Sequence, residues 1–183
     1  MRGKGTFVSI NPGIGKDPLG LYFVAPDQLR GNLEELRLMM EPEIAALAAQ
    51  KVTDQEAEDL FVIAQDMQKQ IDKYSKASGG KKYVQKIMAY DLQFHSLMCN
   101  ICKNDILDQI FPYIIHNLFD IYASENFQMT LSKPRRINTH LALCEAIRDH
   151  DSQKASLLMR RHIMNSRFAS ASHDSAGQEP SLK

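Results

Sequence analysis

Residues 81–102 have the sequence KKYVQKIMAYDLQFHSLMCNIC, and this stretch decides the fold class. Its apolar side chains return every three or four positions, which is the period of an α-helix with one buried face. The inward stripe consists of Val84, Met88, Asp91, His95, Met98 and Cys102. The stretch therefore predicts a helix packed on a core, with a carboxylate and an imidazole on its buried face.

The same period continues through most of the chain. It predicts helices over about 29–47, 53–74, 81–102, 105–124, 132–149 and 152–171. The predicted inward face of the first helix consists of Leu29, Leu33, Leu36, Met40, Ile44 and Leu47. Thr53 and Glu56 form a capping box at the start of the second helix, and Pro112 is expected to kink the fourth or delay its start. Short loops force neighbouring helices to reverse, so the predicted fold is all-α, an antiparallel helical bundle of about six or seven helices.

The ends of the chain differ from this helical middle. The chain has 183 residues, which fits one compact domain with flanking segments. We predict a proline- and glycine-rich linker over 10–26, a helical domain over 27–172 and a disordered tail over 173–183. The fifth helix is expected to begin at Ser132, with Pro134 in its first turn.

Composition and charge restrict the function classes. Lys plus Arg and Asp plus Glu both total 22. This balance argues against binding of the phosphate backbone of a nucleic acid by this chain alone. Three cysteines are an odd count, which favours a reducing compartment. The sequence has no apolar run long enough for a membrane span, and its first residues lack the core of a signal peptide. We therefore expect a cytoplasmic protein without a membrane partner.

Two further histidines take inward positions on the last two helices. His140 and His162 each lie eleven positions from Asp151, which is the centre of the turn between these helices. Two positions equidistant from the turn of an antiparallel hairpin lie at the same height. Both imidazoles are therefore expected to point at one spot inside the bundle.

Together these residues predict a metal site. Asp91 and His95 lie one helical turn apart, and with His140 and His162 they offer one carboxylate oxygen and three nitrogens. This set suits zinc, nickel or manganese and leaves open positions for water or an oxygen ligand. The alternative is a core network of the same four side chains without a metal ion, because a buried carboxylate needs a partner.

The remaining histidines and the cysteines are weaker candidates. Three histidines fall on an outer face, in a turn and in the tail, namely His116, His150 and His173. Cys99 and Cys102 form a solitary CxxC within a helix, which predicts small core residues. Cys99 lies one turn from His95, so a thiolate ligand stays open as an alternative.

Several segments resemble one known domain family. Residues 91–95, DLQFH, followed by Asn104, resemble the D-x-x-F-H…N signature of the FCD (FadR C-terminal) ligand-binding domain. Residues 140–147 and 155–162 resemble its H-x-x-x-x-x-A-I and A-x-x-x-M-x-x-H segments, and 36–49 resembles its L-R…E…A-A-x-L-A-A opening. Upstream, residues 2–8 resemble the wing tip of a GntR-type winged helix, so 1–9 is assigned to a wing remnant. The chain is thus similar to FadR-type members of the GntR family.

The resemblance implies a site and a ligand class. In the metal-binding branch of the family the matching positions hold a divalent ion, here Asp91, His95, His140 and His162. Effectors of this family are small carboxylic or sugar acids, held by the metal and by an arginine from the first helix. Arg37 matches that arginine, with a surface or helix-flank arginine as the alternative. Asn104 is a second effector-binding candidate, with a helix cap next to Asp105 as the alternative.

The resemblance also implies a function. We expect the effector-sensing and dimerisation domain of a bacterial transcription regulator, working as a homodimer and not as an enzyme. Operator DNA would be bound through a winged-helix domain whose helix-turn-helix is missing from this chain. Two alternatives stay open: a metal-dependent enzyme acting on a small organic acid, and a metal-free helical dimerisation module.

Overall fold

The computed structural model describes residues 17, 19–77, 80–124 and 137–174, and these residues are helices joined by short connections. The elements are η1 (Leu21–Phe23), α1 (Pro26–Lys51), α2 (Asp54–Lys76), α3 (Lys81–Ile101), α4 (Asp105–Ser124), α5 (Ile137–Arg148) and α6 (Ser152–Asp174). The described part of the chain contains no strand, which confirms the all-α prediction. Ser132 and Pro134, the predicted start of the fifth helix, lie outside the described residues, as do residues 1–9, which were predicted to be a wing remnant.

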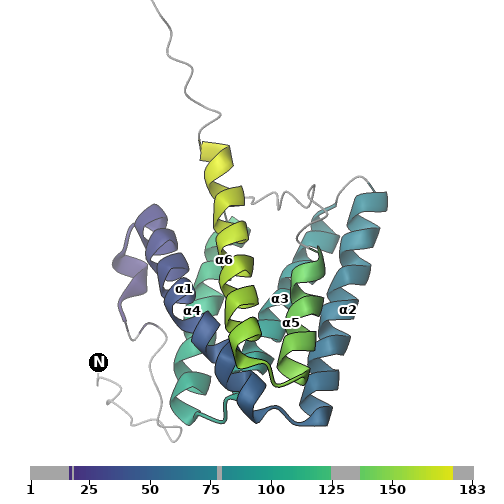
Figure 1. Ribbon diagram of the computed structural model, residues 1–183. Coiled ribbons are helices and arrows are strands. Elements are labelled where there is room, and N and C mark those ends of the chain that lie inside the picture. Colours follow the sequence, from purple (N-terminus) through teal and green to yellow (C-terminus); the bar gives the residue numbers. More distant parts are fainter. Residues whose placement is uncertain (1–16, 18, 78–79, 125–136, 175–183) are drawn as a thin grey trace, which may run out of the picture.

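The six α-helices of the described residues form a closed ring of neighbours (Figure 1). α1 packs on α6, α6 on α5, α5 on α2, α2 on α3, α3 on α4, and α4 returns to α1. α1 also contacts α3 and α5, so four other helices cover it. The main core cluster fills the ring with large side chains that include Phe94, Met98, Phe111, Leu143, Ile147 and Met159. This arrangement puts any polar residue on the covered faces of α1 into the interior.

The buried face of α1 differs from the predicted one. Its buried side chains include Leu29, Leu33, Arg37, Glu41, Ile44, Ala45 and Ala48. Three predicted inward residues, Leu36, Met40 and Leu47, are only half-buried. The real face is therefore rotated from the apolar stripe, and it carries an arginine and a glutamate into the core.

The prolines and helix ends also refine the prediction. α4 runs without a break from Asp105 to Ser124 with Pro112 inside it, so a late start at Pro112 is wrong. α1 likewise contains Pro42, and each proline removes one backbone donor from its helix. α1 begins at Pro26, a favoured residue type for a first helical position. α6 extends to Asp174, so the first residues of the segment predicted as a tail are helical.

The start of α2 has the predicted capping box. Thr53 Oγ1 accepts a hydrogen bond from the Glu56 backbone N–H at 3.3 Å, and Glu56 Oε2 accepts one from the Thr53 N–H at 3.0 Å. We expect Thr53→Ala to lower the free energy of unfolding by about 1 kcal/mol, because an N–H group loses its cap. Urea unfolding of the metal-free protein measures this, with Thr53→Ser as the control that keeps the hydroxyl. Equal losses in both variants would contradict the prediction.

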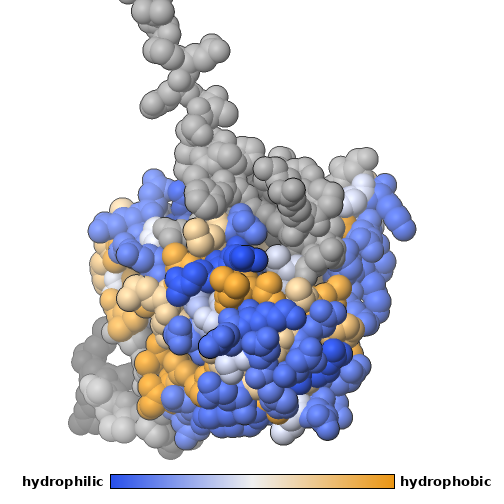
Figure 2. Space-filling view, in the orientation of Figure 1, coloured by the Kyte–Doolittle hydropathy of each residue, from blue (hydrophilic) through white to orange (hydrophobic). Residues whose placement is uncertain are grey.

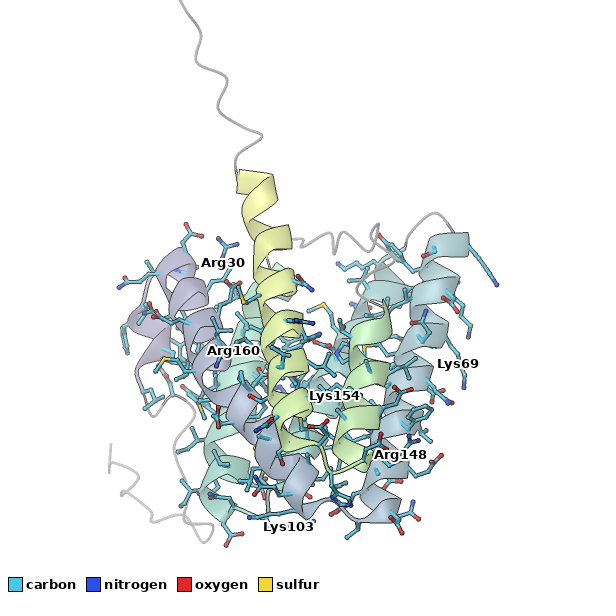
Figure 3. The ribbon with its side chains drawn as sticks, in the orientation of Figure 1. Arg30, Lys69, Lys103, Arg148, Lys154 and Arg160 are labelled. Carbon is cyan, nitrogen blue, oxygen red and sulfur yellow. The ribbon has the colours of Figure 1, made fainter. Side chains whose placement is uncertain are left out.

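The surface of the bundle is mainly polar. Figure 2 shows hydrophilic side chains over most of one face, with smaller hydrophobic areas between them. The basic side chains labelled in Figure 3 are spread over several elements rather than one, namely Arg30, Lys69, Lys103, Arg148, Lys154 and Arg160. No helix in the described residues is long and apolar enough to cross a membrane.

Candidate metal centre

Four side chains from three helices meet in the interior of the bundle. α3 contributes Asp91 and His95, α5 contributes His140, and α6 contributes His162. One potential ligand atom from each residue lies within 4.8 Å of the other three. Asp91 Oδ1 is 3.0 Å from His140 Nε2 and 3.7 Å from His95 Nε2. The structure thus brings together all four residues that were predicted from the sequence as metal ligands.

The α5–α6 hairpin places His140 and His162 at the same level along the two helix axes. The ring centroids of His140 and His162 are 4.4 Å apart, as expected for positions equidistant from the turn. The turn contains His150 in a left-handed conformation with φ 57°, and its Nδ1 lies 2.7 Å from the Ala49 carbonyl oxygen. Asp151 Oδ1 accepts a hydrogen bond from the Lys154 N–H and caps α6. The hairpin is therefore anchored to the end of α1.

Burial and neighbouring charges shift the pKa values of two of the candidate ligands. Burial acts to raise the pKa of Asp91, but the contact with His140 and the nearby imidazoles hold this pKa well below its usual range. Burial lowers the pKa of His162 well below its ordinary value, and His140 and His95 lower it further. Asp91 is therefore an anion and His162 a neutral imidazole at neutral pH. These are the forms in which both residue types bind metals.

Two buried nitrogens of the cluster lack an aligned hydrogen-bond partner. They are His95 Nδ1 and His140 Nε2, although carboxylate oxygens of Glu41 and Asp91 lie 2.7 and 3.0 Å away. Buried polar atoms rarely stay without a partner. Coordination of a cation by His140 Nε2 and Asp91 would satisfy both groups. Three imidazoles and one carboxylate are also a donor set that zinc and similar ions accept, so the residues fit a divalent ion.

A buried arginine and glutamate from α1 adjoin this cluster. Arg37 is only 4% exposed, and its Nη2 lies 3.5 Å from His95 Nε2. Its Nε bonds to Glu41 Oε1, and its Nη2 lies 3.4 Å from Glu41 Oε2. The surface alternative for Arg37 is therefore wrong. Glu41 has no exposed surface, and it is a buried residue of the site that was not predicted from the sequence.

The environment keeps Glu41 ionised. Burial acts to raise the pKa of this carboxyl, but the Arg37 guanidinium and His95 together hold the pKa at about 2. A charged group in the interior requires close partners. Arg37, Glu41 and His95 therefore form one buried ionic network that adjoins the four candidate ligands.

Comparison with known proteins places this arrangement in a family. The family model described as FCD domain matches residues 32–165, which include every residue of the cluster and of the ionic network. The chain belongs to the FCD domain family. FCD domains are the effector-binding part of GntR-type transcription regulators, and the resemblance drawn from the sequence is thereby confirmed.

Solved structures agree with this family. The FCD domain chain matches Streptococcus agalactiae GntR with a TM-score of 0.70 and 29% identity, over 92% of this chain and 73% of that one. It also matches Escherichia coli McbR/YncC with a TM-score of 0.57, over 89% of this chain and 72% of that one. The second match has 18% identity and supports the fold alone. A comparison with curated proteins gave no match.

Asn104 has a structural task in this FCD domain. Its side chain is exposed, and Oδ1 accepts hydrogen bonds from the N–H groups of Ile106 and Leu107 at 3.1 and 3.2 Å. It thus caps the start of α4. This geometry favours the capping alternative, and a contact between Asn104 and an effector stays a prediction.

The cysteines behave as core residues. Burial raises the pKa of Cys99 and Cys144 to about 12 and that of Cys102 to about 11. Cys102 Sγ also donates to the Ile44 carbonyl oxygen at 3.4 Å. A protonated, buried thiol is a poor metal ligand, which favours the core interpretation over a thiolate at Cys99.

These thiols are expected to be unreactive in the folded protein. With DTNB at pH 8, the folded FCD domain should release almost no thionitrobenzoate during the time in which guanidinium-unfolded protein releases three equivalents, because all three cysteines are buried. Absorbance at the thionitrobenzoate band measures the reaction. Rapid modification of one thiol in the folded protein would contradict the predicted burial.

Proposed function

We propose that this FCD domain senses a small carboxylic or sugar acid at a divalent metal site formed by Asp91, His95, His140 and His162. The observation that carries the proposal is the convergence of these four ligands within 4.8 Å in the interior. Zinc, nickel and manganese are the candidate ions. A bound ion would supply a Lewis-acid partner for an oxygen of the acid.

Arg37 supports the choice of an acid as the ligand. Its buried guanidinium lies 3.5 Å from His95 Nε2, so it is a fixed positive charge at the edge of the ligand set. Guanidinium groups bind carboxylates through two parallel hydrogen bonds. An acid between Arg37 and a divalent ion held by the four residues would therefore meet positive charge on both sides, and Arg37 would orient its carboxylate.

The position of the site suggests how binding is transmitted. Arg37 belongs to α1, and the candidate ligands belong to α3, α5 and α6. An acid held between them would favour one packing of these helices over another. In an intact homodimer this shift would change the spacing of winged-helix domains and hence the affinity for operator DNA. Such coupling requires that the two packings differ in their affinity for the acid.

A thermal-shift matrix of zinc, nickel and manganese against organic and sugar acids tests the proposal, together with elemental analysis of the purified protein. We expect one ion to raise the melting temperature and an acid to raise it further only when the ion is present. A ligand at about 100 times its Kd adds about 2.7 kcal/mol of stability. An unchanged melting temperature after chelation would favour the metal-free dimerisation module. Conversion of the acid during incubation would favour the metalloenzyme.

A further inference from the structure

Glu41 contacts both parts of the proposed site. Oε1 accepts from Arg37 Nε, while Oε2 lies 3.4 Å from Arg37 Nη2 and 2.7 Å from His95 Nδ1. All three side chains are at most 5% exposed. One carboxylate therefore lies between a candidate metal ligand and the guanidinium proposed to hold the acid.

Towards His95, Glu41 determines which nitrogen faces the metal site. A carboxylate beside Nδ1 favours a proton on that nitrogen. The lone pair then remains on Nε2, which is the nitrogen 3.7 Å from Asp91 Oδ1. Carboxylates that accept from a ligating histidine also increase its basicity, and their loss typically costs 10–100-fold in metal affinity.

Towards Arg37, Glu41 is expected to weaken the binding of an incoming acid. It engages Nε and Nη2, which form one edge of the guanidinium and can hold a carboxylate through two hydrogen bonds. An acid that uses this edge must displace Glu41 or share the guanidinium with it. Glu41 also offsets the positive charge of Arg37 next to the place of a divalent cation.

We propose that Glu41 is a positioning residue that strengthens metal binding and weakens acid binding, because it orients His95 and holds Arg37. This inference rests on the proposed function. It assigns Glu41 the role of an internal carboxylate that competes with the effector for one arginine. The signature is a pair of affinities that move in opposite directions when the charge of Glu41 is removed.

Glu41→Gln removes the charge and keeps the shape. We expect zinc affinity, measured by competition with a chromophoric chelator, to fall about 10–100-fold. On zinc-saturated protein, calorimetry with gluconate and acetate should give about tenfold tighter binding, because Arg37 loses a charged hydrogen-bond partner. Glu43→Gln, an exposed charge on the same helix, should change neither affinity. Two affinities that fall together, or that both stay unchanged, would overturn the inference.

A measurement on the wild-type protein avoids dependence on variant folding. With zinc bound, the ring nitrogens of His95 should show a proton on Nδ1 and zinc on Nε2 in two-bond ¹H–¹⁵N spectra. Zinc on Nδ1 would overturn the inference even if the proposed function holds. A wild-type protein that binds no zinc would overturn the proposed function and this inference together. Binding of zinc and gluconate by the wild type with parallel losses in Glu41→Gln would overturn the inference alone.

Discussion

Asp91→Asn is expected to lower zinc affinity by at least about 100-fold, which exceeds the usual loss from a residue that only orients a ligand. Asp91 is the one carboxylate among the four candidate ligands, and its Oδ1 contacts His140 and lies 3.7 Å from His95. Asparagine keeps the shape but has no charge to offset a divalent ion. In wild-type protein, zinc at about 1,000 times its Kd should add about 4 kcal/mol of stability.

For a domain of this size, that stabilisation corresponds to a rise of roughly 8–16 °C in melting temperature. Differential scanning calorimetry with zinc and with a chelator measures the rise, which Asp91→Asn should largely lose. Asp120→Asn, an exposed aspartate on α4, should keep the full rise. Zinc stabilisation of Asp91→Asn equal to that of wild type would mean that the ion binds elsewhere.

Arg37→Met is expected to lower the free energy of unfolding of the metal-free protein by about 3–5 kcal/mol. The substitution leaves Glu41 charged and fully buried without its guanidinium partner, and a broken buried ion pair costs about this much. Urea unfolding at pH 7 measures the loss. Arg160→Met removes an exposed arginine from α6 and should change the value by less than about 0.5 kcal/mol.

The double variant Arg37→Met with Glu41→Leu separates lost charge pairing from lost packing. Replacement of a whole buried ion pair by apolar groups is often nearly neutral, so the double variant should recover about 2 kcal/mol of the loss. Recovery stays incomplete because His95 Nδ1 loses the nearby Oε2 of Glu41. A single Arg37→Met variant that costs less than about 1 kcal/mol would show that the ionic network adds little to stability.

The sequence predicted most of the helical framework because period and capping are local properties. The stripe of α3 placed Asp91 and His95 inward, and the capping box of Thr53 and Glu56 opened α2 as expected. That His140 and His162 lie side by side across the hairpin followed from their equal distance from its turn. These inferences need only neighbours along the chain.

Glu41 was not predicted as a site residue because helices far away in the sequence bury it. An arginine followed by a glutamate four positions later is a common pair on a solvated helix face. Here four other helices cover α1, so the pair is buried. A signal was available, since Arg37, Glu41 and Ala45 continue from Leu33 of the apolar stripe at a spacing of four residues. Polar residues on a buried stripe revealed the ligands on α3, and the same test applied to α1 would have found Glu41.

The α5–α6 hairpin limits how the length of this chain can vary in evolution or in design. One residue inserted within α5 after His140 would turn this side chain by about 100° relative to the turn and move it about 1.5 Å along the axis. The pairing with His162 across the interior would then be lost, although both histidines would still be encoded. Insertions between the two histidines would have to enter the turn at 149–151, and there they would disturb the contact of His150 with Ala49. The 21 residues that separate the histidines are therefore constrained in number more strictly than in identity.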